Sequence, residues 1–239
     1  MKKILGCIRR ADQDFSMIQE GDRIAVGVSG GKDSLTLLKA LRLYQYFSKT
    51  PFELEAITLT MGLEPFDLSG VEKLCADLGI RYTVRHTQIG KIIFDVRKEK
   101  NPCSLCANMR RGALHNVALE LGCNKVALGH HREDVIETFF LSLFYEGRLN
   151  TFPPVTYLDR KKITLIRPMI YVPEKEIVSY ARKEELPVVY NPCPANGLTK
   201  RQYMKDLMAS ICQDIPGAKE RVLSALRNKK QYNLWDKYM

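Results

Sequence analysis

The stretch Val26-Gly-Val-Ser-Gly-Gly-Lys-Asp-Ser34 decides the fold that this sequence predicts. Residues 23–28 form a short, mainly apolar run of the kind found in buried strands, and two adjacent glycines follow it directly. Leu35, Leu38 and Leu41 then recur at helical spacing. A buried strand, a tight turn and a helix in this order indicate the start of an α/β fold with parallel strands.

The turn itself has the composition of an anion site. Gly30 and Gly31 lack Cβ, so the backbone can approach a ligand closely. The N–H groups that follow lie at a helix N-terminus, where the helix dipole favours an anion, and Ser29 and Ser34 add hydroxyl donors. Asp33 fits such a site if a cation such as Mg²⁺ bridges it to phosphate. The alternative is an ordinary serine-capped turn, which needs only one glycine and no acidic residue.

The rest of the chain alternates strands with helices up to about residue 190. Further strands are expected at Phe52–Thr60, Tyr82–His86, Lys125–Gly129 and Ile163–Ile166. Helices are expected at Ser69–Leu78, Ser104–Leu121, Asp134–Phe144 and Pro173–Lys183. This alternation predicts an α/β fold, doubly wound, with a mostly parallel sheet of five strands covered on both faces.

The two ends of the chain differ from this middle part. Lys2–Glu20 is predicted to be helical. From Asn191 onward there is no strand signal, and nine basic residues stand against four acidic ones, which predicts helices over Thr199–Asp214 and Ala218–Asn228. We therefore expect an N-terminal helical segment (1–22), a nucleotide-binding domain (23–190) and a basic helical C-terminal tail (191–239).

Composition limits the classes of function. The chain has 239 residues, of which 45% are hydrophobic and 27% charged, as in folded globular proteins. Its net charge of +10 fits a polyanionic partner such as nucleic acid, or equally a solubilising surface charge. No apolar run approaches the ~18–20 residues of a membrane span, and Met1–Arg10 has no secretory signal. We expect a cytoplasmic protein without a membrane partner.

Seven cysteines in such a chain direct attention to metal binding rather than disulfides. Cys103 and Cys106 form one CxxC pair, and a third thiol, Cys193, follows a second Asn-Pro in the later sequence. Three thiolates suit a [4Fe–4S] cluster that leaves one iron open. A structural zinc with a fourth ligand, such as a histidine, is the alternative. Cys75 lies on an apolar helical face and is interpreted as a core residue.

Ser29-Gly-Gly-Lys-Asp-Ser34 resembles the SGGxDS PP-loop of the N-type ATP pyrophosphatases. With residues 102–112, 127–140 and 166–170, the chain is similar to the tRNA 2-thiocytidine synthetase group over about residues 24–205. This resemblance implies an adenine nucleotide alpha hydrolase-like fold and an ATP-dependent tRNA sulfurtransferase. It further implies that ATP, with Mg²⁺, activates the C2 oxygen of a tRNA pyrimidine, for which cytidine is expected, and that sulfur replaces this oxygen with the help of a [4Fe–4S] cluster.

Candidate site residues are assigned from their positions in these motifs. The resemblance implies cluster ligands at Cys103, Cys106 and Cys193. The expected ATP site comprises Ser29, Gly30, Gly31, Lys32, Asp33, Ser34, Gly129 and His130. Asp134 is interpreted as a general base or Mg²⁺ ligand, or else as a helix cap. Arg110 is interpreted as neutralising the adenylated intermediate, or else as part of a solvated helix face.

Expected partners are tRNA and a sulfur donor, either a cysteine desulfurase or sulfide; a homodimer is an arrangement that the sequence leaves open. Basic side chains expected at tRNA phosphates are Lys200, Arg201, Lys205, Lys229, Lys230, Arg97, Lys98 and Lys100. Aromatic side chains expected to stack on bases, or to anchor the tail, are Tyr203, Tyr232, Trp235 and Tyr238. Two other functions stay open: an amidating, lysidine-type synthetase with structural zinc, and a basic RNA-binding module that is not an enzyme. The first would be active without iron, and the second would bind ATP without releasing pyrophosphate.

Overall fold

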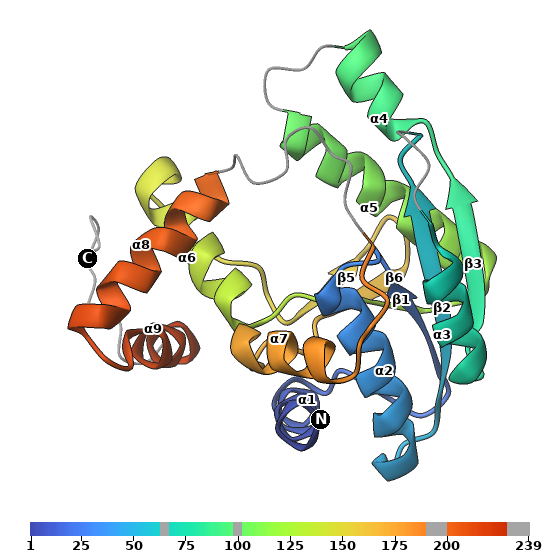
Figure 1. The fold of residues 1–239 in the computed structure, drawn as a ribbon, viewed down its shortest axis with the longest axis horizontal. Helices are drawn as coiled ribbons and strands as arrows, with labels where there is room; N and C mark the ends of the chain where they lie inside the picture. Colours follow the sequence, from blue (N-terminus) through green and yellow to red (C-terminus); the bar gives the residue numbers. More distant parts are fainter. Residues whose placement is uncertain (63–66, 98–101, 190–199, 229–239) are drawn as a thin grey trace. The chain divides into compact units, whose positions relative to one another are not determined.

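A computed structural model describes residues 1–62, 67–97, 102–189 and 200–228 of the chain. The chain divides into two compact units (Figure 1). The sheet unit comprises Met1–His131 and Pro153–Gly197, and the helical unit comprises Arg132–Phe152 and Leu198–Met239. The three-part division expected from the sequence stays a prediction.

The sheet unit is built on a single mixed sheet of six strands with the order β3-β2-β1-β4-β6-β5. All pairs are parallel except β5 with β6, which form an antiparallel hairpin. The strands are β1 (Asp22–Gly27), β2 (Phe52–Thr60), β3 (Arg81–His86), β4 (Lys125–Ala127), β5 (Val155–Leu158) and β6 (Ile163–Ile166). All five expected strands are present. The sheet has a sixth strand, β5, so the predicted number of strands was wrong. Strand β5 escapes the sequence pattern because none of its residues is fully buried.

Helices cover both faces of this sheet, which confirms the doubly wound α/β class. Helix α5 (Pro102–Glu120) packs Leu114, Val117 and Ala118 into a cluster that includes side chains of β1, β2, β4 and β6. The opposite face carries α2 (Lys32–Phe47), which contacts α1 (Lys2–Phe15) and α7 (Glu174–Lys183). The guanidinium Nε of Arg42 on α2 donates to the Leu78 carbonyl, at the end of α3 (Ser69–Asp77), over 2.8 Å.

The helices differ most from expectation at the end of α1 and between β3 and α5. Helix α1 ends at Phe15, five residues before the predicted end, because Ser16 adopts a left-handed conformation with φ of 48°. A short helix α4 (Ile89–Lys91) and a π-helical turn η1 (Ile92–Val96) lie between β3 and α5, where no helix was expected.

The connections reverse direction between β1 and β4. From β1 the chain moves outward through α2 to β2 and then to β3, whereas β4 pairs with the other side of β1. In open parallel sheets, ligands bind at the carboxyl ends of the two strands that flank such a switch point. The turn after β1 and the turn after β4 therefore form the expected ligand edge.

The helical unit contains α6 (Arg132–Glu146), α8 (Lys200–Asp214) and α9 (Ala218–Arg227). Their small core consists of Ile136, Met208 and Ala218, with Phe140, Ile211, Cys212 and Val222 packed against it. Both helices predicted for the tail are present. In the described part of the chain, none of the helices has the length and apolar character needed to span a bilayer.

A buried ion pair at the amino edge of the sheet leads to a stability prediction. Lys125 Nζ lies 2.7 Å from Asp22 Oδ2, and the two side chains are only 8% and 3% exposed. We expect Asp22→Asn to lower the free energy of unfolding by about 3 kcal/mol, because it leaves the Lys125 charge buried without its counter-charge. Urea denaturation measures the change. The control, Glu120→Gln, removes the exposed pair of Glu120 with Arg85 and should cost less than about 1 kcal/mol.

Candidate nucleotide site and cysteine pair

Strand β1 and its neighbours hold the start of the glycine-rich turn in place. The Val28 N–H donates to the Ile57 carbonyl over 2.8 Å. The Val28 carbonyl accepts the Thr58 hydroxyl at 2.7 Å, and Thr58 in turn accepts the Tyr82 hydroxyl at 2.8 Å. Three adjacent strands therefore fix the backbone at the point where the turn begins.

Within the turn, Ser34 is the central hydrogen-bonding residue. Its buried hydroxyl donates to the Gly31 carbonyl at 2.9 Å and accepts the Ser29 N–H at 3.1 Å. Gly30 adopts φ of +80°, a conformation that other residues rarely take. The turn opens directly into α2, whose first N–H groups have no intrahelical acceptor and therefore point toward any anion bound there.

The segment that ends at Val189 packs against Gly30. The Val189 N–H donates to the Gly30 carbonyl over 3.0 Å. A Cβ on Gly30 would lie 2.9 Å from the Val189 Cβ, which is closer than real Cβ contacts allow. The turn is thus shaped both by its own residues and by a segment 159 positions later in the chain.

Gly129, in the turn after β4, packs against the first turn of α2. A Cβ on Gly129 would lie 3.1–3.2 Å from the Asp33 carbonyl group and the Ser34 nitrogen. The sequence prediction that this loop borders the nucleotide site agrees with this proximity. The next residue, His130, is half-buried. The Nε2 atom of His131 lies 3.8 Å from Asp33 Oδ1.

This contact yields a second prediction. Gly129→Ala should push the Asp33–Ser34 backbone away by a few tenths of an ångström, since backbone atoms cannot rotate aside. We expect the KM for ATP to rise about tenfold, because the displaced N–H groups are those that face the anion. The effect is measured by ATP–pyrophosphate exchange. Gly112→Ala, on α5 with nothing within 4 Å of the new Cβ, serves as the control and should leave KM unchanged.

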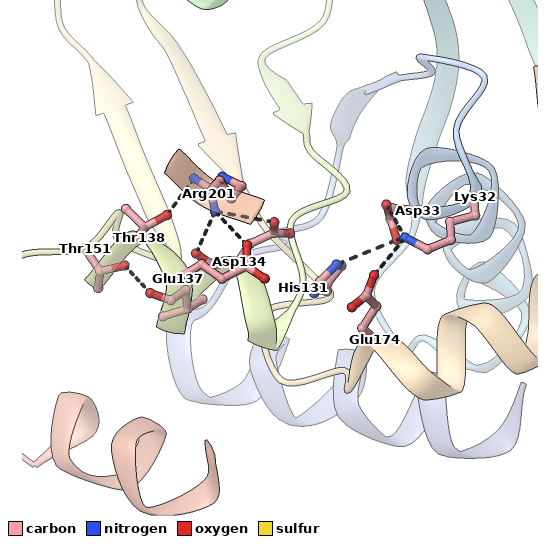
Figure 2. A network of polar contacts seen from close by, with 10 residues as sticks. Lys32, Asp33, His131, Asp134, Glu137, Thr138, Thr151, Glu174 and Arg201 are labelled. Carbon is pink, nitrogen blue, oxygen red and sulfur yellow. Dashed lines mark hydrogen bonds and ion pairs between the residues drawn. The ribbon is translucent and has the colours of Figure 1, made fainter. Parts of the chain in front are cut away.

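Charged side chains gather at the start of α2 (Figure 2). Lys32 Nζ lies 3.0 Å from both carboxylate oxygens of Asp33 and 3.2 Å from Glu174 Oε1, at the beginning of α7. Burial disfavours the Lys32 charge, but the two carboxylates outweigh it and raise the pKa of Lys32. Glu174 was not among the predicted site residues; its only sequence signal is an acidic residue just after the helix-starting Pro173.

The CxxC pair occupies the first turn of α5. Cys103 is exposed and Cys106 is half-buried, and neither forms a disulfide. Because α5 runs antiparallel to the strands, its first turns lie toward the carboxyl edge of the sheet, the same edge as the glycine-rich turn. Cys193 lies outside the described residues, and within those residues no three or more His, Cys, Asp or Glu side chains are grouped to hold a metal ion.

Thiol chemistry at this position fits an iron–sulfur cluster. Cysteine sulfur is the soft donor that iron in such clusters takes. Cys103 is exposed and Cys106 is half-buried, and both lie near the N-terminal end of a helix, where negative charge is favoured. Arg110 is exposed on the same helix, one turn beyond Cys106. Of the three ligands that the sequence predicts, Cys103 and Cys106 lie within the described residues.

Asp134 belongs to the helical unit. It is the third residue of α6 rather than its cap, and its carboxylate lies 3.7 Å from Arg201 Nη1. The same guanidinium lies 3.2 Å from Glu137 Oε2 and donates to the Thr138 hydroxyl over 3.0 Å (Figure 2). Arg201, expected at tRNA phosphates, is thus used in a network that ties α8 to α6.

Of the other expected tRNA contacts, Arg97, Lys200, Lys205 and Tyr203 are described, whereas Lys98, Lys100, Lys229, Lys230, Tyr232, Trp235 and Tyr238 lie outside the described residues. Lys200 Nζ lies 4.3 Å from the ring centroid of Tyr145, and Tyr203 is exposed.

Solved structures of other proteins share this α/β fold. A U34-tRNA thiolase, NcsA from Methanococcus maripaludis with its [4Fe–4S] cluster, is similar with a TM-score of 0.73 and 26% identity, over 93% of this chain and 76% of that one. An NH₃-dependent NAD synthetase from Campylobacter jejuni shares the fold alone, with a TM-score of 0.51 and 17% identity over 97% and 93% of the two chains.

Comparison of sequences identifies the family. Residues 6–209 match the PP-loop domain. A tRNA-cytidine(32) 2-sulfurtransferase from Geobacter sulfurreducens is 39% identical over 98% of this chain and 93% of its own length, and one from Citrifermentans bemidjiense is 38% identical over the same shares. The chain therefore belongs to the PP-loop family and, within it, to the group of the tRNA-cytidine(32) 2-sulfurtransferases.

Proposed function

We propose that this protein is an ATP-dependent tRNA thiolase that replaces the C2 oxygen of cytidine 32 in tRNA with sulfur. The observation that carries the proposal is similarity to curated sulfurtransferases along nearly the whole chain, which includes both the PP-loop and the CxxC pair. The geometry supports it, because the glycine-rich turn, the start of α2 and the first turns of α5 all lie toward one edge of the sheet.

The turn is built to hold the pyrophosphate of ATP. Its phosphate oxygens accept hydrogen bonds from the N–H groups at the start of α2, while Lys32 neutralises their charge. Asp33 offers carboxylate oxygens, the ligands that Mg²⁺ prefers. The cytosine O2 attacks the α-phosphorus, the bond to the β-phosphate oxygen breaks, and pyrophosphate leaves. A sulfur nucleophile then replaces the O2-bound AMP, so the products are 2-thiocytidine, AMP and pyrophosphate.

Cys103 and Cys106 are the described residues that would hold the [4Fe–4S] cluster, with Cys193 as the predicted third ligand. With three thiolates, the cluster supplies an iron that is open to a sulfur ligand. The protein's part is to present both thiols from the first turn of a rigid helix, so that their separation is fixed by the helical backbone.

Two further residues are proposed to act on the substrate. Arg110, exposed on α5, neutralises charge on the phosphate of the adenylated base. Asp134 acts as the general base or as a Mg²⁺ ligand, and Arg201 holds its carboxylate in one orientation. We also propose that the enzyme works in the cytoplasm, on tRNA held by basic residues such as Lys200 and Lys205, with sulfur supplied by a cysteine desulfurase or by sulfide. Association into a homodimer is a further proposal.

The test combines metal analysis with product analysis. Protein purified without oxygen should contain about four irons and four acid-labile sulfides per chain. With ATP, Mg²⁺, a sulfide source and tRNA from a strain that lacks this modification, mass spectrometry of the digested tRNA should detect 2-thiocytidine at position 32. Omission of ATP is the control. One zinc without iron, or cleavage of ATP without thiolated product under these conditions, would contradict the proposal.

A further inference from the structure

In the described part of the chain, one salt bridge joins α2 to α7 at the nucleotide site and another joins them away from it. Both helices follow the carboxyl ends of parallel strands, β1 and β6, so both begin at the ligand edge of the sheet. At these helix starts, Lys32 Nζ lies 3.2 Å from Glu174 Oε1. Further along, Lys39 Nζ lies 2.7 Å from Oε2 of Glu184, the residue that follows the last turn of α7. The two bridges are alike in chemistry and differ in their distance from the glycine-rich turn.

The backbone around Glu174 is held firmly. Met169 and Val172, just before α7, are fully buried, and the Val172 N–H donates to the Met169 carbonyl over 2.8 Å. Pro173 then precedes the helix with its φ fixed by the ring, and its carbonyl accepts the Glu176 N–H at 3.0 Å. The Glu174 side chain is only 17% exposed. Its carboxylate is therefore presented from a rigid helix start, which fixes its position better than a loop would.

Lys32 occupies a position where a cation needs support. It is the first residue of α2, and the positive end of a helix dipole disfavours a cation there. Two carboxylates compensate, because Lys32 Nζ lies 3.0 Å from both oxygens of Asp33 and 3.2 Å from Glu174. Asp33 belongs to the same turn of helix, whereas Glu174 approaches from α7 (Figure 2). Glu174 therefore sets a direction for the Lys32 side chain that α2 alone does not supply.

The Lys32 ammonium can bind a phosphate while it keeps both carboxylates. An ammonium group carries three N–H donors, so one can reach a phosphate oxygen while the others hold Asp33 and Glu174. The Lys32 side chain is 31% exposed and is thus accessible to a ligand in the turn. When the bond from the α-phosphorus to the bridging oxygen breaks, its electron pair leaves with pyrophosphate. A cation that is already in place stabilises this developing charge without having to reorient.

We propose that Glu174 is a positioning residue for the adenylation step, in which it holds the Lys32 ammonium beside the glycine-rich turn to meet the departing pyrophosphate. This inference rests on the ATP-dependent half of the proposed function. In this role Glu174 contacts Lys32 rather than ATP. It therefore differs from a residue that binds Mg²⁺ directly and from one that only fastens α7 to α2.

A double-mutant cycle tests this role by ATP–pyrophosphate exchange with the whole protein, tRNA and Mg²⁺. Glu174→Gln should lower kcat about tenfold and change the KM for ATP less than about threefold, since the N–H groups that bind ATP stay in place. Lys32→Met alone should lower kcat at least as much. In the Lys32→Met variant, Glu174→Gln should change kcat less than about twofold, because the side chain that Glu174 positions is then absent.

The matched control is Glu184→Gln, which removes the same charge from the other bridge between α2 and α7. It should leave kcat and KM unchanged. If thermal unfolding shows that Glu174→Gln does not fold, Glu174→Asp takes its place in the cycle, since it keeps the charge on a side chain too short to reach Lys32.

Three results would overturn the proposal: an unchanged kcat in Glu174→Gln, an equal loss in Glu184→Gln, or a further tenfold loss from Glu174→Gln in the Lys32→Met variant. The last of these, together with a raised requirement for Mg²⁺, would make Glu174 a metal ligand. If the unaltered protein exchanges no pyrophosphate under these conditions, the proposed function itself fails, and this inference fails with it.

Discussion

Cys106→Ser is expected to reduce thiolation of tRNA by about a thousandfold or more, because removal of one member of a group that acts as a unit removes nearly all of its effect. Cys106 supplies one of the two described thiols that would hold the cluster, and a serine hydroxyl is a hard oxygen donor that iron–sulfur clusters accept poorly. The loss is measured as 2-thiocytidine formed per enzyme, together with iron bound after anaerobic reconstitution.

The two halves of the reaction should respond differently to this substitution. Release of pyrophosphate from ATP in the presence of tRNA depends on the turn after β1 and should persist. The control is Cys212→Ser, which alters a half-buried cysteine of α8 in the helical unit and should thiolate normally. Normal thiolation and normal iron content in Cys106→Ser would show that the CxxC pair has no part in the cluster.

Gly30→Ala is expected to lower kcat/KM for ATP about a hundredfold, since groups that hold a reacting ligand act through its position. Two effects add at this residue. Alanine at φ of +80° is strained, and its methyl group would lie 2.9 Å from the Val189 Cβ. The backbone must therefore move in the turn that we propose holds the pyrophosphate of ATP. ATP–pyrophosphate exchange measures the loss.

The variant Gly21→Ala separates the effect of backbone strain from an effect on ATP turnover. Gly21 has nearly the same φ, +79°, but nothing lies within 4 Å of a Cβ placed there. Gly21→Ala should thus lower the free energy of unfolding by about 1 kcal/mol and keep ATP turnover at the level of the unaltered protein. An equal loss of turnover in both variants would mean that Gly30 matters only for stability.

The elements that the sequence predicts best are those with strong local signals. The apolar run before the glycines, the leucine spacing after them and the alternation further along the chain predict five strands and the major helices correctly. Strand β5 was missed because none of its residues is fully buried, so it lacks the apolar run that marks β4 and β6. Helix α4 was missed because three residues are too few to show a helical period. The left-handed Ser16 also has no local signal, so the end of α1 was placed too late.

The predictions for the site residues also succeeded where the signal was local and failed where it was not. The turn Ser29–Ser34 and the loop at Gly129 come together as predicted, because consecutive parallel strands end at one edge of the sheet. The pairings of Lys32 with Glu174 and of Asp134 with Arg201 could not be predicted, since each joins residues more than 60 positions apart whose contact depends on how helices pack. The role of Cys193 stays a prediction.

The hydrogen bond from Val189 to the Gly30 carbonyl has a consequence for biosynthesis. A growing polypeptide emerges from the ribosome in sequence order, so the segment with the glycine-rich turn is made long before its partner. Until residue 189 has left the exit tunnel, the turn lacks this bond and the β6 and α7 segments that lead to it. Contacts of such large sequence separation form late in folding, so the nascent chain should acquire its full affinity for ATP only after residue 189 has emerged.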